Sequence, residues 1–285
     1  MNQIRPLAPG DEVVLDRFLR AHADSSMFLR ANARRAGLED RGEALHGSYV
    51  AAFDEMAIVA VAAHYWNGMI VLQAPVLAGD LARAAVAHSG RHLRGLAGPW
   101  AQVETARAAL GATHHRAAKA SREGLHALAL ARLIVPTPLA TGRCTCRHAR
   151  PEDVELLTEW RTAYAREALG ASDSPTLREE SREDIDLLRR ERGAFVLDVD
   201  GRPVAFAAYN AQLPEIVQIG GVWTPPTLRG RGYGRAVTAG ALLAARDAGA
   251  RRGVLFTDSL AASRAYEALG FERIGEYGLL RLAEE

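Results

Sequence analysis

The fold is decided by the stretch Gly221-Val222-Trp223-Thr224-Pro225-Pro226-Thr227-Leu228-Arg229-Gly230-Arg231-Gly232-Tyr233-Gly234-Arg235. An apolar run, Ile216 to Trp223, leads into the two prolines, and small and aliphatic residues (Ala236 to Ala245) follow the last glycine. This order predicts a strand, a glycine-rich turn and a helix. Such a turn presents free backbone N–H groups and the positive end of a helix to an anion. Arg229 and Arg231 add guanidinium groups, which bind phosphate in a bidentate manner. The stretch therefore predicts a site for a ligand that carries phosphate.

The composition is that of a soluble globular protein. The chain has 285 residues, of which 48% are hydrophobic and 24% charged, enough for one large domain or two of ordinary size. The net charge of +1 provides no overall field that would attract nucleic acid or an acidic membrane. The N-terminus lacks the pattern of a signal peptide, and no apolar run reaches the roughly 18 residues of a membrane span. We therefore expect a cytoplasmic protein with no nucleic-acid or membrane partner.

Cys144, Cys146 and His148 have the look of a metal-binding triplet. One strand, however, cannot easily place three ligands around a tetrahedral ion, so we expect two half-buried cysteines, a surface histidine and no metal. Cysteines two positions apart also rarely suit a disulfide, so nothing indicates an oxidising compartment.

The second half of the sequence repeats the first. Arg147, Pro151 and Asp153 follow Arg5, Pro9 and Asp11 at one constant spacing of 142 residues. Further echoes are Gly193-Ala194-Phe195-Val196 with Gly47-Ser48-Tyr49-Val50, Asp200 with Asp54, and Leu269-Gly270 with Leu110-Gly111. Matched order of elements indicates a duplication. Because the segment around Pro136 and Pro138 has the composition of a linker, the expected domains are 1–136 and 144–285, joined by 137–143.

Periodicity and turn residues predict the elements of each half. In the first half they predict strands over 3–7, 47–52, 57–65, 69–74 and 125–135, and helices from Asp11 (as N-cap), over 27–36, from 80 to about 87 and over 100–110. In the second half they predict a hairpin over 195–199 and 204–209, strands over 216–223 and 253–258, and a helix over 261–269.

The two halves differ at the turn that follows the central strand. After Pro75 the first half continues with Val76-Leu77-Ala78-Gly79-Asp80, which has no arginine, a single glycine and an acidic residue where a phosphate would lie. We therefore expect only the second half to keep a ligand site.

Two elements of the second half match one known family. Arg229-Gly230-Arg231-Gly232-Tyr233-Gly234 fits the pattern Arg/Gln-x-x-Gly-x-Gly/Ala and, with the strand and prolines before it, resembles the acetyl-CoA-binding signature of the GNAT N-acetyltransferase superfamily. The strand Gly253 to Asp258, the helix with Tyr266, and Gly270-Phe271 resemble the C-terminal part of the same family. The resemblance covers residues 144–285 well and the first half in outline. The whole is similar to acetyltransferases built from two GNAT-like halves, one of them degenerate.

The resemblance implies an α/β fold, in which each half is a mostly antiparallel mixed sheet with helices on both faces. In the second half the parallel strands Ile216–Trp223 and Gly253–Asp258 would splay apart. Acetyl-CoA would lie in the gap as co-substrate, with its pantetheine arm on the backbone near Val222 and Thr224. Its pyrophosphate would lie on the N–H groups of Arg229 to Gly234. The implied cofactor-binding residues are Val222, Trp223, Thr224, Arg229, Gly230, Arg231, Gly232, Tyr233, Gly234, Arg235 and Ser259, the last standing where an asparagine is common.

The implied activity is transfer of an acetyl group from acetyl-CoA to a primary amine by direct attack in a ternary complex. Tyr266 matches the family position that often protonates the leaving thiolate, although a core tyrosine packed on Phe271 is the alternative. Glu215 is the acidic residue nearest to the motif strand and is the candidate base, with a water chain or a merely solvated glutamate as alternatives. A backbone N–H close to Val222 would polarise the thioester carbonyl.

Several questions stay open at this level. A catalytically silent acyl-CoA sensor or scaffold is the alternative function. The acceptor is an amine-bearing small molecule or peptide of unknown identity, for which the mixed-charge run at 178–184 mildly favours a cationic compound. The chain could be a monomer or a homodimer.

Overall fold

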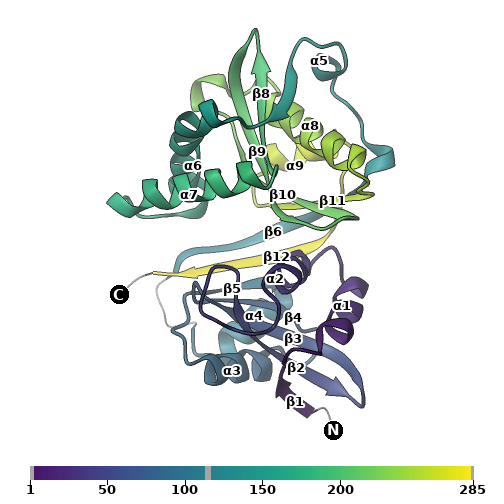
Figure 1. Ribbon diagram of the computed structural model, residues 1–285, viewed down its shortest axis with the longest axis vertical. Coiled ribbons are helices and arrows are strands. Elements are labelled where there is room, and N and C mark those ends of the chain that lie inside the picture. Colours follow the sequence, from purple (N-terminus) through teal and green to yellow (C-terminus); the bar gives the residue numbers. More distant parts are fainter. Residues whose placement is uncertain (1–2, 113–116, 284–285) are drawn as a thin grey trace. The chain divides into compact units, whose positions relative to one another are not determined.

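The computed structural model describes residues 3–112 and 117–283. The chain forms two compact units, Met1–Leu125 with Gly275–Glu285, and His126–Ile274. Each unit is a mixed sheet with helices on both faces, and the order of elements in the first recurs in the second (Figure 1). The predicted fold class of two similar α/β halves is therefore confirmed.

The elements of the first unit, in chain order, are β1 (Gln3–Pro6), α1 (Glu12–Ala21), α2 (Met27–Ala36), β2 (Gly47–Asp54), β3 (Ala57–Tyr65), β4 (Met69–Gln73), α3 (Ala78–Ser89), β5 (Gly95–Pro99), α4 (Trp100–Ala109) and most of β6 (Ala117–Ala129). The second unit takes the end of β6, a 3₁₀ turn (Leu130–Arg132), α5 (Thr137–Ala140), β7 (Thr145–His148), a 3₁₀ turn (Pro151–Asp153), α6 (Val154–Leu169), α7 (Pro175–Arg190), β8 (Ala194–Val199), β9 (Arg202–Gln212), β10 (Ile216–Trp223), a 3₁₀ turn (Pro226–Leu228), α8 (Tyr233–Asp247), β11 (Arg252–Thr257), α9 (Leu260–Glu267) and the start of β12 (Glu272–Leu282).

Each sheet contains one parallel pair among antiparallel neighbours. The first runs β1-β2-β3-β4-β5 with β4 and β5 parallel, and the second runs β7-β8-β9-β10-β11 with β10 and β11 parallel. Beside β5 lies the end of the chain, since Tyr277–Arg281 of β12 pairs antiparallel with Gly95–Pro99.

The compact units do not end at the boundaries expected from composition. The last strand of the chain completes the first unit's sheet, and the residues from His126 onward belong to the second unit. The expected linker also has structure of its own, because Thr137–Ala140 forms α5 and Leu139 packs on the hydrophobic core. Strand pairing, which joins residues far apart in the sequence, decides these boundaries.

Other elements differ from the prediction in detail. The strand expected over 125–135 lies earlier, at 117–129, and β5 was not predicted because its glycines and proline read as a loop. Asp11 is the N-cap residue of α1, but its side chain makes no capping hydrogen bond to the helix. It binds Arg5 instead.

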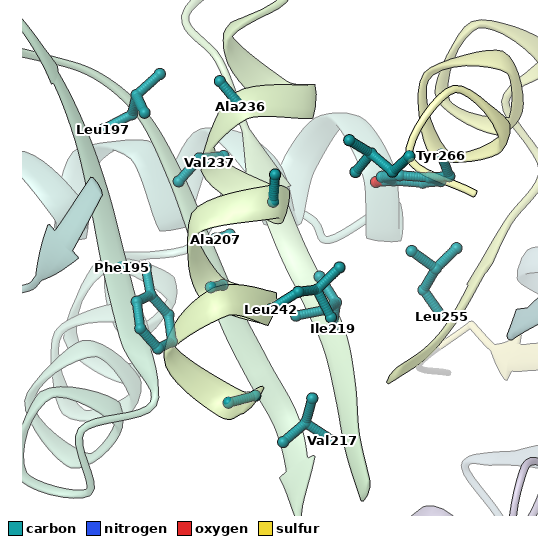
Figure 2. Close-up of a cluster of buried hydrophobic side chains, with 14 of the residues drawn as sticks. Phe195, Leu197, Ala207, Val217, Ile219, Ala236, Val237, Leu242, Leu255 and Tyr266 are labelled. Carbon is teal, nitrogen blue, oxygen red and sulfur yellow. The ribbon is translucent and has the colours of Figure 1, made fainter. Parts of the chain in front are cut away.

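The core of the second unit shows why α8 is made of small residues. Alternate strand residues point to opposite faces, so Phe195, Ala207 and Ile219 face α8, together with Tyr266 of α9 (Figure 2). The opposite face packs against α6 and α7. A Cβ at Gly240 would lie 2.2 Å from the Cβ of Cys146, so the helix approaches the sheet as closely as a glycine allows. This close packing fixes the start of α8 over the ends of the strands.

An arginine–aspartate pair closes the first strand–helix connection of each half. Arg5 donates to both carboxylate oxygens of Asp11 at 2.7 and 2.8 Å, and Arg147 donates to those of Asp153 at 2.6 and 3.0 Å. The Arg5 hydrogen bonds lower the pKa of Asp11 to about 2. Burial raises the pKa of Asp153, but the hydrogen bonds from Arg147 and from the Arg150 backbone outweigh this and lower it. The repeated sequence pattern thus encodes a repeated interaction.

We expect Arg147→Ala to lower the free energy of unfolding by about 2–3 kcal/mol at pH 7, because Asp153 and Asp198 lose their shared partner. Arg178→Ala, which breaks an exposed pair with Glu155, is the control and should cost less than about 1 kcal/mol. Because the pKa of Asp153 is lowered, the stabilisation is present above pH ~4 and is lost as the pH falls below that. Urea titrations at pH 7 and pH 3 measure it; equal losses for both variants would contradict the prediction.

Candidate functional site

The second unit's parallel strands separate midway along their length. The paired residues are Ile216 with Arg252, Val217 with Gly253 and Gln218 with Val254. Beyond Gln218, β10 continues to Trp223 and β11 to Thr257 without further pairing between them. Each strand therefore has unpaired backbone groups on the side that faces the other, as the splayed arrangement requires.

A bulge reshapes β10 along this unpaired part. Gly220 lies opposite Ala208 and Trp223 opposite Phe206, so Gly221 and Val222 together face one residue of β9. Gly221 has φ = +59°, a conformation that side-chain-bearing residues rarely adopt. A bulge of this kind takes a backbone group out of the ladder and re-aims it. The N–H groups around Val222 are therefore placed to bind a ligand.

The glycine-rich turn leads into the start of α8 with unpaired backbone N–H groups. Gly230 and Gly232 have φ of +79° and +78°, and α8 begins at Tyr233. Within the described part of the chain, Gly230, Arg231 and Gly232 donate no backbone hydrogen bond. The first N–H groups of α8 add to these, because the first turn of a helix has no intrahelical acceptors. Free N–H groups and the positive helix end favour a phosphate here.

Gly234 keeps the space beside this turn open. A Cβ at this position would lie 3.7 Å from both Thr224 Oγ1 and Val222 Cγ1. It would therefore fill the space between the start of α8 and the end of β10 without a clash. Glycine leaves that space to a ligand running from the unpaired edge of β10 to the turn.

Arg229 binds other groups of the protein, whereas the sequence predicted that its guanidinium would bind phosphate. Its Nη2 lies 2.9 Å from Glu167 Oε2, its Nε donates to the Thr224 carbonyl at 3.0 Å, and its guanidinium lies 4.8 Å from the centre of the Trp223 ring. Arg229 therefore fastens the turn to α6. Arg231 and Arg235 form no ion pair with any described residue, and the Nε of Arg235 is buried without a hydrogen-bond partner among them.

Tyr266 lies on α9 and extends from that helix in the direction of α8 (Figure 2). It is 8% exposed, its ring packs edge-on against Phe271 at 6.1 Å, and its hydroxyl has no hydrogen-bond partner among the described residues. Burial, and to a lesser extent the nearby Tyr164, raises the pKa of Tyr266 above its usual value near 10. The hydroxyl is therefore protonated at neutral pH and can donate. The ring also serves the core, so the two interpretations of this residue are compatible.

Two other predicted site residues, Glu215 and Ser259, lie on either side of the segment that contains β10, the turn and α8. Glu215 precedes β10, at the end opposite to Val222, and at about 3.3 Å per residue the two are separated by roughly 20 Å. Its carbonyl accepts from the Arg251 and Arg252 N–H groups. This position removes Glu215 from the site. Ser259 is the N-cap of α9, where its Oγ accepts from the Ala262 N–H at 3.3 Å and keeps its own proton to donate.

The sequence did not single out the residues of α6 that lie beside Trp223. Tyr164 packs edge-on against Trp223 at 6.4 Å, and Arg161 lies 5.5 Å from the centre of the Tyr164 ring. With Glu167, these residues stand three apart on α6. Helical spacing was the available signal, but it does not show which face of a helix meets the strand.

The corresponding place in the first unit is closed. The last residues paired between β4 and β5 are Val71 and Ala97, and soon afterwards the Ala74 N–H donates to the side chain of Gln102 at 2.6 Å. The turn from β4 to α3 spans only Ala74–Leu77. Asp80, in the first turn of α3, is paired with Arg83. A backbone N–H beyond the paired part of β4 is thus satisfied by a side chain of the protein itself.

Two further features bear on the class of protein. Among residues 3–112 and 117–283, no three His, Cys, Asp or Glu side chains are grouped so as to hold a metal ion. Burial raises the pKa of Cys146 to about 12, so its thiol is a poor metal ligand at neutral pH. In the same part of the chain no helix is both long enough and apolar enough to span a membrane.

Comparisons with known proteins agree with this geometry. Residues 154–271 match the sequence profile of the acetyltransferase (GNAT) family. Similar solved structures include a Drosophila protein (11% identity, 99% of both chains, TM-score 0.67) and a GCN5-related N-acetyltransferase from Sphaerobacter thermophilus (16% identity, 98% of this chain and 95% of the other, TM-score 0.61). A tandem GNAT protein from the clavulanic acid biosynthesis pathway is also similar (15% identity, 100% and 98%, TM-score 0.56).

At these identities the solved structures show the fold alone. A comparison with curated proteins gives no match. The family profile covers the strand fork, the glycine turn and Tyr266, and the tandem structure is matched along nearly its whole length. Membership of this family supports acyl transfer as the chemistry of the second half. Residues 154–271 therefore form a domain of the acetyltransferase (GNAT) family, and the chain as a whole has the fold of tandem GNAT proteins.

Proposed function

We propose that this protein is an acetyl-CoA-dependent N-acetyltransferase with one site, in its second half, and that a primary amine attacks directly in a ternary complex. The observation that carries the proposal is the fork between β10 and β11, whose β10 arm ends in a turn of free N–H groups. An unpaired strand edge suits the amides of a pantetheine arm, and the turn suits a pyrophosphate.

The described residues fit this co-substrate. The unpaired backbone near Val222 and Thr224 would hold the pantetheine arm, and the N–H groups from Gly230 to Arg235 would hold the pyrophosphate. Gly234 leaves the connecting space open. Acetyl-CoA would supply the thioester, which carries the acetyl group in activated form. Arg229 acts indirectly by holding the turn against α6 through Glu167.

Two groups of the protein would lower the barrier to transfer. An N–H group at the bulge beside Val222 would donate to the carbonyl oxygen as negative charge develops there. The Tyr266 hydroxyl, kept protonated by its raised pKa, would donate a proton to the departing sulfur. The amine must attack as the neutral base. Because Glu215 lies at the far end of β10, water is the better candidate to take the proton that the amine loses.

The charged run at 178–184 of α7 does not identify the amine. Arg178 and Arg182 pair with Glu155, and Asp184 pairs with Arg161 at 2.9 Å. Arg178, Arg182 and Asp184 are thus engaged in ion pairs between α6 and α7. The aromatic pair of Tyr164 and Trp223 lies next to the bulge and would form part of the acceptor side, for a small molecule or a peptide.

A panel of amines tests the function directly. Steady release of thiol from acetyl-CoA with at least one amine is expected, with mass spectrometry of the acetylated product. Binding of acetyl-CoA without turnover on any amine would support a silent acyl-CoA sensor instead. Failure to bind acetyl-CoA would exclude both functions.

Replacing Tyr266 by Phe should lower kcat about 100-fold while the Kd for acetyl-CoA stays within twofold, because a general acid typically contributes 10²–10⁴. The phenylalanine keeps the packing against Phe271. Tyr209→Phe, which removes a buried hydroxyl bonded to the Ala241 carbonyl, is the matched control and should keep its kcat.

The pH profile provides a second readout for Tyr266. Because its pKa is raised above 10, the wild type should show no loss of kcat from this group as the pH rises to 10. An unchanged kcat in Tyr266→Phe would leave the tyrosine a purely structural role.

Substituting Gly234 by Ala should weaken acetyl-CoA binding about tenfold or more without unfolding the protein, because the new methyl group enters the ligand's space at ordinary contact distance. Alanine also favours the helix, so the melting temperature should hold or rise. Isothermal titration and thermal melting together measure this. A variant with wild-type affinity would contradict the placement of the ligand beside Gly234.

One molecule of acetyl-CoA should bind per chain, because Gln102 fills the corresponding place in the first half. Calorimetry of the wild type should therefore give a stoichiometry of one. Gly232→Pro, which distorts the turn of the second half, should abolish all binding. Residual binding to this variant, or a stoichiometry of two, would show that the first half is also a site.

A further inference from the structure

A hollow of about 340 Å³ lies in the first unit, between α1 and the turn that joins β2 to β3. Its apolar lining comes from Val14 and Phe18 of the helix and from Met56 and Ile58 of the hairpin. Met56 is 88% exposed, and Val13, which precedes Val14 on α1, is 73% exposed. Large apolar side chains that gather at one exposed place are typical of a surface that binds another molecule.

The second half builds the same hairpin without an apolar residue in its turn. Two residues form each turn, Glu55-Met56 between β2 and β3 and Asp200-Gly201 between β8 and β9. Glu55 and Asp200 have φ of +52° and +50°, so the two turns begin in the same conformation. The next residue is a glycine in the second half and a methionine in the first. The hairpin therefore does not need the methionine in order to fold.

The helix shows a similar difference between the halves. Val13 corresponds to Glu155, because each lies two residues after the aspartate of the arginine–aspartate pair. Glu155 accepts hydrogen bonds from Arg178 and Arg182 of α7, so its side chain has partners within the chain. Val13 gains little from folding, because most of its side chain stays in water. The first half thus exposes apolar side chains where the second half has a paired charge and a glycine.

Charged groups of both signs line the same hollow. Arg17 lines it from α1, and Asp54 and Glu55 line it from the hairpin. None of the three forms an ion pair with any residue in 3–112 or 117–283. A foreign partner of one charge would be attracted by part of this set and repelled by the rest. A second copy related by a twofold axis presents the same set in reverse, so that Arg17 of each copy meets the carboxylates of the other.

We propose that this face, formed by α1 and the β2–β3 turn, is the interface at which two copies of the chain form a homodimer. Contact between two such faces takes the exposed Val13 and Met56 side chains of both copies out of water, which favours association. Each Arg17 then lies opposite Asp54 and Glu55 of the other copy, which fixes the register of the pair. The inference concerns the first half and does not depend on the proposed function.

Sedimentation of the full chain at concentrations from about 1 to 100 μM measures the Kd of the dimer, and the wild type should dimerise in this range. Met56→Gly, which gives the turn the residue of the second half, should raise this Kd about tenfold or more, because apolar contact is lost. Arg190→Glu, which changes an exposed arginine at the end of α7, is the control and should leave the Kd unchanged. The melting temperature verifies that each variant is folded.

A charge exchange tests the pairing itself. Arg17→Glu alone, and Asp54→Lys combined with Glu55→Lys, should each raise the Kd about 30-fold or more, because like charges would then face each other. An equimolar mixture of the two variants should recover a dimer of near wild-type affinity, since opposite charges meet again, and native mass spectrometry identifies it as mixed. A wild type that stays monomeric overturns the inference, as does a dimer whose Kd none of these substitutions changes. Variants that stay monomeric when mixed would overturn it as well.

Discussion

The separation of β10 from β11 after Gln218 is the constraint on which the rest of the second unit depends. In the middle of a sheet, the backbone N–H and C=O groups of a strand are normally all hydrogen-bonded to the two neighbouring strands. Here the bulge at Gly221 and the prolines after Thr224 turn β10 away, and its edge is left for a ligand. Such an edge would invite pairing with another chain if it lay open at the margin of a sheet. Here the unpaired edge lies between β10 and β11, inside the sheet and not at its margin.

Close packing of small residues fixes the position of the glycine turn relative to the separated ends of β10 and β11. α8 rests on the sheet through alanines and Gly240, with almost no space between Gly240 and Cys146. The start of the helix, and with it the anion site, is therefore positioned by the core and not by the loop. On the other side Arg229 links the turn to α6 through Glu167. Part of the segment around α5 lies beside the same turn, where Pro138 and Arg143 line a small cavity together with Arg231 and Arg235.

The two halves share one architecture but differ at the turn that follows the central strand. Both have the arginine–aspartate pair, a parallel strand pair and a helix that follows it. In the first half the turn is short and Gln102 satisfies the Ala74 N–H, so the hydrogen-bonding groups that could have met a ligand are satisfied by the protein. The stabilising interactions lie in the core and in the ion pairs, which do not require the site.

By itself the sequence determined the local elements and the chemistry of the turn. The limits of β10 agree with the apolar run Ile216–Trp223, and the glycines at 230 and 232 take the positive φ that only their residue type adopts freely. The duplication could also be recognised there, because it depends on residue type and spacing. Tertiary structure decided what depends on contacts between distant segments: that Arg229 binds Glu167, that Glu215 lies at the wrong end of its strand, that β12 completes the first unit, and that Arg143 lines a cavity. Spacing along a chain predicts which way neighbouring side chains point, but only the packed fold brings together residues that the chain keeps far apart.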